Sequence, residues 1–317
     1  MQVLEPNLTI MNVSKGALLL LFFVLPFVDL LANTNSTNTN EPISFLRSSK
    51  THVSKKSFSN RWENNSFAMQ VSYNKDVKKF VKKYIAKDRH GTELLLGRQT
   101  MYFPIFEKYI QEFGLPKELK NIPIIESSLN PKAESQVGAR GLWQFMPATA
   151  RQYGLVINDY VDERCDPVKS TKAALTFLKD LHDRYGDWKL AIAAYNCGPG
   201  RVNKAIRRSN KFNFEGIKKY LPKETRNYVA KFIATSYVTE NYFFHDLRPS
   251  YPEYTLQFCK VVKVHKRMSL KAVAKKTGMD IEIIRKLNPS YRKGIIPPSA
   301  DGNFIIIPIF GEELSMN

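Results

Sequence analysis

Cysteine is scarce in this chain, and its pattern excludes several kinds of site. The three cysteines, Cys165, Cys197 and Cys259, lie far apart in the 317 residues. None belongs to a C-x-x-C pair or to a Cys/His set with zinc-ligand spacing, so we expect no metal and no other cofactor. A single disulfide could form, but the sequence does not say between which two. Small buried thiols are the simpler interpretation of each.

Acidic residues are also few. The chain has 29 Asp and Glu against 48 Lys and Arg, which gives a formal net charge of +19. Such an excess favours a polyanionic partner: nucleic acid, an anionic membrane surface or an anionic cell-wall polymer. The basic residues are spread along the chain without a long block or a nucleic-acid motif, so we expect no nucleic-acid partner. Hydrophobic residues make up 43% of the chain, which is enough for a folded core.

The N-terminus carries an apolar run that begins after Lys15 and continues to Ala32. A basic residue, a short apolar stretch and a small residue near its end are typical of a secretory signal peptide, with cleavage after Ala32. Pro26 and Asp29 interrupt the run, which is short for a transmembrane helix. An uncleaved anchor is the alternative. No cysteine follows the run, so a lipid-linked N-terminus is not supported. We expect export to the periplasm or cell envelope.

Composition and periodicity predict a mainly α protein with a small α+β addition. Beyond a segment rich in Asn, Ser, Thr and Lys, apolar residues recur at helical spacing and no convincing strand appears until residue 244. After Pro249 the pattern changes to strand, helix, helix, strand. The predicted regions are residues 1–32 (signal peptide), 33–71 (flexible linker), 72–248 (helical domain) and 255–310 (βααβ module).

We expect helices in the first domain at residues 76–85, 99–113, 116–125, 147–153, 166–185, 188–195, 201–208 and 222–244. In the module we expect strands at residues 256–264 and 304–309, and helices at residues 269–277 and 280–287.

Residues 122–147 carry the clearest chemical signal. Glu126 ends an apolar run, and a carboxylate beside apolar residues loses hydration, which raises its pKa. A general acid that works near neutral pH requires such a pKa. Further on, Gln144 stands between bulky apolar residues, a composition suited to binding a sugar. The alternative is an amphipathic helix end whose Glu126 faces water.

Four short motifs follow one another in the helical domain: E-S-S at 126–128, G-L-W-Q-F-M-P at 141–147, A-A-Y-N-C-G at 193–198 and E-T-R-N-Y-V at 224–229. In order and spacing this set resembles the lysozyme-like family 1 lytic transglycosylases, most closely their membrane-bound murein transglycosylase D type. The resemblance covers about residues 99–244. It implies a lysozyme-like helical domain that acts on peptidoglycan glycan strands.

The resemblance also implies roles for single residues. Glu126 matches the family's one catalytic glutamate. Trp143 stands where many members have Met, although the most similar type also has Trp. Which of Ser127 and Ser128 contacts the sugar is open. The matches to substrate-binding positions are Ser127, Gln144, Met146, Tyr195, Asn196 and Tyr228.

A second catalytic carboxylate is missing from the four motifs. Hydrolytic glycosidases generally use a second carboxylate as nucleophile or base. Glu224 is not in an obvious position for this role, because it begins a helix and can instead complement the helix dipole. The resemblance implies that a group of the substrate takes the place of the second carboxylate. Glu126 protonates the leaving oxygen of the MurNAc-β-1,4-GlcNAc bond, and the C6 hydroxyl of MurNAc attacks C1. Glu126 then accepts the proton of that hydroxyl. On this resemblance the product would be a 1,6-anhydroMurNAc end, and the enzyme would be a polysaccharide lyase.

The same residues also have purely structural interpretations. Tyr195 could be core, Gln144 could cap a turn, Tyr228 could pack a helix, and Asn196 could end one. The alternative functions are a hydrolytic muramidase and a non-catalytic cell-wall-binding protein. Three further polar residues are interpreted as helix caps or surface groups: Asp162, Asp166 and His182.

Residues 261–308 resemble a degenerate LysM repeat. The match rests on S-L-K-A-V-A at 269–274, L-N-P at 287–289 and I-I-I-P at 305–308. LysM modules bind the N-acetylglucosamine backbone of wall glycans, which would raise the local substrate concentration. The usual Gly-Asp-Thr-Leu opening is absent, so a module that only packs against the enzyme is the alternative. The expected partner is peptidoglycan, with a peripheral membrane or wall association left open and the oligomeric state unknown.

Overall fold

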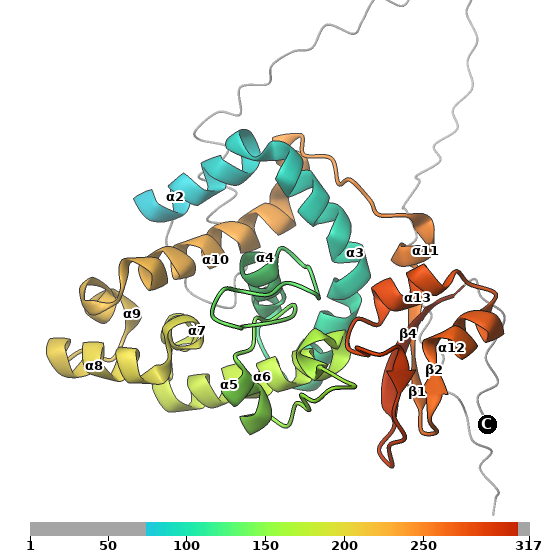
Figure 1. Cartoon of the computed structure of the whole chain (residues 1–317). Coiled ribbons are helices and arrows are strands. Elements are labelled where there is room, and N and C mark those ends of the chain that lie inside the picture. Colours follow the sequence, from blue (N-terminus) through green and yellow to red (C-terminus); the bar gives the residue numbers. More distant parts are fainter. Residues whose placement is uncertain (1–73, 310–317) are drawn as a thin grey trace, which may run out of the picture. The chain divides into compact units, whose positions relative to one another are not determined.

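The computed structural model describes residues 74–309. The predicted signal peptide and linker lie outside the described residues and stay predictions. Among residues 74–309 no helix is both long and apolar enough to cross a bilayer. The predicted fold class is confirmed: the chain is mainly helical, and a small strand-containing module follows the helical domain (Figure 1).

The helical domain contains these elements in order: α2 (Lys75–Lys82), the π-helix η1 (Lys83–Lys87), α3 (Arg89–Glu112), the 3-10 turn η2 (Lys117–Asn121), α4 (Ile122–Ser127), α5 (Pro147–Gln152), η3 (Glu163–Cys165), α6 (Pro167–Tyr185), α7 (Trp188–Cys197), α8 (Pro199–Ser209), α9 (Phe214–Ile217), η4 (Lys218–Tyr220), α10 (Lys223–Asn241) and η5 (Tyr242–His245). A single turn, α11 (Tyr254–Gln257), leads into the module.

Helix α6 illustrates how local sequence sets an element's limits. The side chain of Asp166 accepts hydrogen bonds from the backbone N–H groups of Val168 and Lys169, and Pro167 occupies the first turn. The helix ends at Gly186, whose φ of 66° suits glycine. The predicted cap at Asp166 is confirmed.

Two predicted helices differ from the structure. The helix expected at residues 116–125 is a 3-10 turn followed by α4, because Pro123 has no N–H to continue the hydrogen-bond ladder across the junction. The helix expected at residues 99–113 begins ten residues earlier, at Arg89, and passes through Pro104. Its first turns escaped prediction because they carry only a weak apolar pattern, although Thr92, Leu96 and Gly97 are buried.

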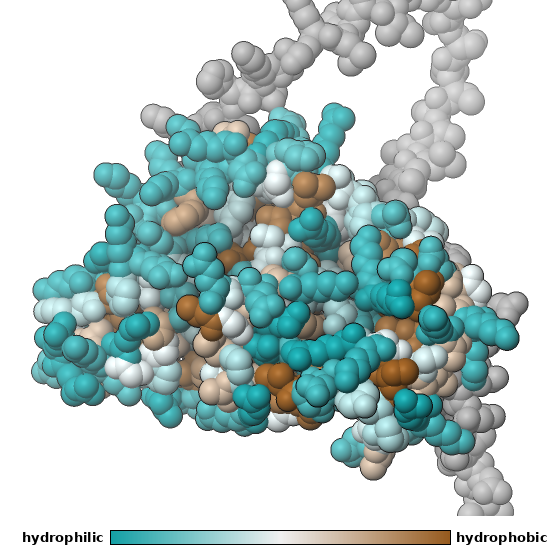
Figure 2. All heavy atoms as spheres, in the orientation of Figure 1, coloured by the Kyte–Doolittle hydropathy of each residue, from teal (hydrophilic) through white to brown (hydrophobic). Residues whose placement is uncertain are grey.

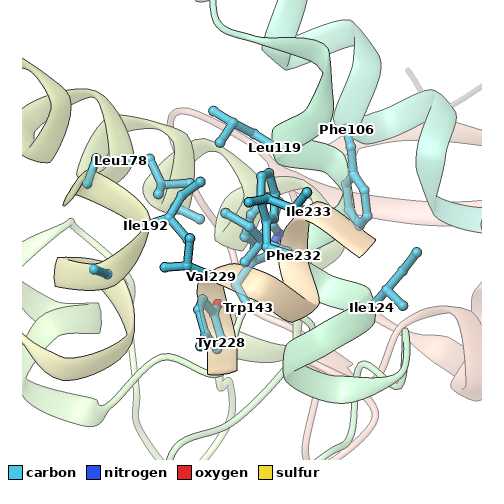
Figure 3. Close-up of a cluster of buried hydrophobic side chains, with 14 of the residues drawn as sticks. Phe106, Leu119, Ile124, Trp143, Leu178, Ile192, Tyr228, Val229, Phe232 and Ile233 are labelled. Carbon is cyan, nitrogen blue, oxygen red and sulfur yellow. The ribbon is translucent and has the colours of Figure 1, made fainter. Parts of the chain in front are cut away.

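Helix α10 runs through the centre of the domain and packs against α2, α4 and α7. Figure 3 shows its buried residues Tyr228, Val229, Phe232 and Ile233 among core side chains from other elements. Helix α4 contacts α10 and the turn η2, and η2 in turn packs on the long helix α3. The short helix that carries Glu126 is therefore held by long, well-packed helices.

The C-terminal module has the predicted βααβ order. Strands β1 (Cys259–Val264) and β4 (Asn303–Pro308) pair antiparallel, and α12 (Leu270–Thr277) and α13 (Ile281–Leu287) lie between them in sequence. A second antiparallel pair, β2 (Met268–Ser269) and β3 (Ile295–Ile296), was not predicted because two-residue strands leave no periodic pattern. All three cysteines are free thiols.

Candidate active site

Helix α4 places Glu126 in its last turn. Ile122 and Ile124 of this helix are buried in the core, whereas Glu126 is half-buried. The helix ends at Ser128, which takes a left-handed conformation with φ of 53° and is exposed. A short helix anchored by two isoleucines thus presents one carboxylate at its end.

The carboxyl group of Glu126 receives a hydrogen bond from Tyr228, whose Oη lies 2.5 Å from Oε1. Burial raises the pKa of Glu126 from 4.5 to about 7, although the Tyr228 hydrogen bond and the charge of Lys231 lower it, and the charge of Glu224 raises it. A substantial fraction of Glu126 is therefore protonated at neutral pH. This is the state from which a carboxyl can act as a general acid.

Lys231 is a neighbour of Glu126 that sequence reasoning missed. It follows Tyr228 by three residues, so both lie on one face of α10. Its Nζ donates to the backbone oxygen of Ile125 at 3.2 Å. Burial is the main cause that lowers the pKa of Lys231, with Lys83 adding to it and Glu126 opposing it. The helical spacing from Tyr228 was the signal available in the sequence.

Tyr195 reaches this region from α7 but does not bond to Glu126. Its Oη donates to the backbone oxygen of Trp143 at 2.7 Å. Its ring lies 5.3 Å from the ring of Phe177. Burial holds the pKa of Tyr195 well above its ordinary value, and the charge of Glu126 adds to this. Tyr195 therefore stays neutral and fixes the backbone immediately before Gln144.

The segment that carries Gln144 is a tightly folded loop. Gly141 has φ of 86°, and a Cβ there would lie 1.8 Å from the backbone oxygen of Arg164. Gln144 itself has φ of 49°, and its Nε2 donates to the oxygens of Ala133 and Gly141 at 3.1 and 2.9 Å. Within residues 74–309 no donor is bonded to its Oε1. The neighbouring Met146 is 42% exposed.

The aromatic residues beside Gln144 do not flank a sugar site, so this expectation was wrong. Trp143 is fully buried and Phe145 is 3% exposed. The indole nitrogen of Trp143 donates to the Thr171 hydroxyl at 2.9 Å, and its ring packs on Phe106. Figure 3 shows Trp143 inside the core. The left-handed backbone at Gln144 turns the two aromatic side chains inward.

Ser127 and Asn196 bond to other parts of the protein. The Ser127 hydroxyl lies 2.9 Å from both the Pro123 and the Leu142 oxygens, and with one proton it donates to one of them at a time. Asn196 Oδ1 accepts from the Thr225 hydroxyl at 2.9 Å. These bonds join α4 to the Gln144 loop and α7 to α10. A sugar contact by either residue stays a prediction.

A second buried carboxylate lies in the same domain. The predicted role of Asp162 as a cap is confirmed, because its side chain accepts a hydrogen bond from the backbone N–H of Arg164 at the start of η3; it is not a surface group, since it is only 1% exposed. Three arginines approach it: Arg164 at 2.9 Å, Arg292 at 2.6 Å and Arg140 at 3.6 Å. We call these four residues the Asp162 cluster. Burial acts to raise the pKa of Asp162, but hydrogen bonds and charges from Arg164 and Arg292 hold it below its ordinary value.

Comparisons with known proteins agree with these observations. Residues 104–217 match the family model described as the Transglycosylase SLT domain, and residues 258–309 match the lytic transglycosylase MltD, LysM-like domain. Membrane-bound lytic murein transglycosylase D of Escherichia coli (strain K12) is 30% identical over 245 residues, which cover 76% of this chain and 53% of the relative. The chain therefore spans about half the length of that relative.

Two further similarities cover less of the chain. The transglycosylase of Enterobacteria phage PRD1 is 40% identical over 88 residues, 28% of this chain and 31% of its own length. The crystal structure of the 70 kDa soluble lytic transglycosylase of Escherichia coli is 28% identical over 47% of this chain and 26% of its own, with a TM-score of 0.38.

Proposed function

We propose that this chain, which combines a Transglycosylase SLT domain with an MltD-type LysM-like domain, is an exported peptidoglycan lytic transglycosylase. The observation that supports this best is the carboxyl of Glu126, which is bonded to Tyr228 at 2.5 Å and has a pKa raised by burial to about 7. The proposed domain limits are residues 72–248 and 255–310.

In the proposed reaction Glu126 gives its proton to the oxygen that leaves C1 of MurNAc, and the C1–O4 bond breaks. The C6 hydroxyl of the same MurNAc then attacks C1, and its proton passes to the Glu126 carboxylate. This restores the acid and leaves a 1,6-anhydro end without consuming water. Tyr228 stabilises the carboxylate between the two steps, because a hydrogen bond to the charged form favours it.

The other predicted contacts have different kinds of support. Gln144 Oε1 is free of described protein donors, and Met146 is exposed, so both can meet a sugar. Tyr195, Ser127 and Asn196 bond to the protein, and we propose that they act on substrate through the groups that they position.

The test is mass spectrometry of sacculi digested by the full chain. We expect soluble fragments with 1,6-anhydroMurNAc ends. Reducing MurNAc ends would show that water is the nucleophile, and binding without release of fragments would show a wall-binding protein. Either outcome overturns the proposal.

The hydrolytic muramidase is the second candidate, and one observation favours it. Glu224, exposed in the first turn of α10, is near enough for its charge to raise the pKa of Glu126. It could serve as base for an attacking water. If Glu224→Gln abolished activity as fully as Glu126→Gln, a two-carboxylate hydrolysis would explain the enzyme better.

Export and location rest on sequence expectations and on a relative. The N-terminal apolar run lies outside the described residues, and the relative from Escherichia coli is named membrane-bound. We propose that the chain works in the cell envelope on peptidoglycan strands, at the wall or at a membrane surface. Fractionation of cells that express the full chain tests this, and recovery of the active protein in the cytoplasm would contradict it.

A further inference from the structure

A cavity of about 970 Å³ lies between the helical domain and the C-terminal module, and its lining includes none of the residues around Glu126. One wall is formed by residues 152–156, at the end of α5 and just after it, and by one face of α6. The other is formed by Lys263 of β1 and by the segment 297–304. We call it the interdomain cavity. Its volume is at the upper end of the range for small-ligand sites, roughly 300–1,000 Å³.

The two walls are joined by direct bonds, so the cavity exists without a ligand. Arg292 of the module bonds to Asp162 at 2.6 Å, and its backbone N–H donates to the oxygen of Tyr160 at 2.9 Å. Lys169 Nζ lies 3.2 Å from Asn303 Oδ1. Val161 packs in the hydrophobic core of the module. A preformed site binds its ligand at a lower ordering cost.

Three lysines line the cavity, and two of them, Lys172 and Lys263, are available to an anion. The third, Lys169, is already paired with Glu163 at 2.5 Å. Lys172 lies over the ring of Tyr109 at 4.9 Å, and Lys263 lies over the ring of Phe304 at 5.6 Å. Within residues 74–309 neither of these two forms an ion pair.

Each ring face holds one side of its ammonium group and leaves the other side for a carboxylate. The lining contains two carboxylates, Glu163 and Asp301, and Glu163 is already paired with Lys169. The two remaining lysines therefore outnumber the one remaining carboxylate, and the net unpaired charge is positive. The cavity thus has the charge to attract an acidic ligand.

The cavity also has flat apolar surface, supplied by Tyr153, Phe304 and the pair Pro297 and Pro298. Tyr153 connects it to the region of Glu126 through two ring contacts: its ring is 4.9 Å from Phe177, and Phe177 is 5.3 Å from Tyr195. A ligand here would therefore lie a short way from the proposed site of bond cleavage. The unpaired positive charge of the lining, rather than its apolar surface, favours a ligand that carries carboxylates over a neutral sugar.

We propose that the interdomain cavity binds the peptide stem of peptidoglycan, with Lys172 and Lys263 holding its carboxylates. The inference rests on the proposed function, because peptidoglycan joins such peptides to the glycan that Glu126 would cleave. The module then helps to form a peptide site together with the enzyme, independently of any glycan binding of its own.

Calorimetry on the full chain carrying Glu126→Gln tests this, because that variant does not consume its ligand. The probes are a synthetic stem tetrapeptide with free carboxylates, the same peptide fully amidated, and chitotetraose as a peptide-free glycan. We expect Lys263→Glu and Lys172→Glu each to weaken binding of the free peptide about tenfold or more. Amidation of the peptide should weaken it similarly.

Matched controls come from α6, which also carries Lys172, and from the C-terminal module, which also carries Lys263. Lys179→Glu on α6 and Lys286→Glu on α13 reverse exposed charges outside the cavity and should change the affinity by less than about twofold. The inference is overturned if the peptide does not bind, if charge reversal in the cavity has no more effect than the controls, or if the two cavity variants weaken chitotetraose instead.

A parallel digest separates this inference from the proposed function. If the unmutated chain makes 1,6-anhydro ends but fails the peptide test, only the peptide site is lost. If it makes no such ends while the peptide binds through Lys172 and Lys263, the proposed reaction is lost and the peptide site stands.

Discussion

The molecule buries two carboxylates in opposite ways. Around Glu126 the hydrogen-bond partner is a neutral phenol, and burial raises the pKa to about 7. Around Asp162 burial acts in the same direction, but Arg164 and Arg292 outweigh it and the pKa is lowered. The one group keeps a proton that it can transfer. The other is charged at neutral pH.

The difference teaches how a buried acid is used. A carboxylate that is surrounded by arginines joins segments: Arg164 also donates to the oxygens of Gly138 and Phe145, and Arg292 belongs to the C-terminal module. A carboxylate without such partners costs stability when it ionises, and enzymes tolerate that cost where the proton is needed. The Asp162 cluster thus joins segments of the fold, whereas the Glu126 region is the one for which we propose a catalytic role.

The largest expected difference between the Glu126 region and the Asp162 cluster is the effect of substitutions on activity. Glu126→Gln should lower the rate of sacculus solubilisation by about a thousandfold, because the variant has no proton to transfer. Turbidity assays on purified sacculi measure this. Glu107→Gln, which removes an exposed carboxylate paired with Lys120, should leave the rate unchanged. Appreciable activity in the Glu126 variant would move the catalytic acid elsewhere.

The corresponding substitution at the other carboxylate, Asp162→Asn, should lower the stability of the fold. It leaves three arginines around a neutral amide, which we expect to lower the free energy of unfolding by about 3 kcal/mol. Urea unfolding measures this. Because the pKa of Asp162 is lowered, its contribution is present above pH 3.8 and is lost only as the pH falls further.

The loss on Asp162→Asn should therefore be the same at pH 5 and pH 8. The matched control is Asp183→Asn, which breaks an exposed pair with Lys179 and should cost less than about 0.5 kcal/mol. A similar loss in both variants would show that the Asp162 cluster is no more than a surface network.

Linkage predicts that the acid at Glu126 destabilises the fold in alkali. Its raised pKa means that its contribution to stability is full below pH 4.5 and is lost as the pH rises through about 7. Glu126→Gln should therefore be more stable than the unmutated chain at pH 8, by on the order of 2 kcal/mol, and the difference should fall below about 1 kcal/mol at pH 5. Thermal unfolding at the two pH values checks the sign. Equal stabilities at both would mean that Glu126 is well solvated.

The smallest expected effect is a shift of the pH profile. Tyr228→Phe removes a hydrogen bond that lowers the pKa of Glu126, while burial still raises it. The alkaline limb of activity should move to higher pH by about one unit, and the rate at the optimum should fall by about tenfold because the carboxylate between the two steps is less stabilised. Rates from pH 5 to 9 measure both. A lower rate with an unmoved limb would assign Tyr228 to sugar binding alone.

Much of the fold could be predicted from local pattern. The helices α6 and α7 and the βααβ order were expected because caps, glycine stops and apolar spacing are short-range signals. The 3-10 turn before α4 and the early start of α3 were not, since tertiary packing decides whether a weak pattern becomes helix.

The residues of the candidate site also separate into those that local sequence identified and those that only the tertiary structure revealed. Glu126 was identifiable because its apolar neighbours adjoin it in sequence, and the motif order led to Tyr228. Lys231 was not identified, and Trp143 was misplaced, because a sequence does not state which way a loop with left-handed residues turns its side chains. Asp162 was recognised as a cap, but its ion pair with the module was not, because Arg292 is 130 residues away along the chain.

By itself the sequence determined the order of the elements and the presence of one acid at the end of an apolar turn. Both depend on neighbours within a few residues, where spacing and solvation act directly. Only the tertiary structure decided that this acid bonds to Tyr228, that Asp162 holds the module to the helical domain, and that a cavity lies between them. Those properties depend on charges and hydrogen bonds between residues far apart in sequence, whose partners only packing can choose.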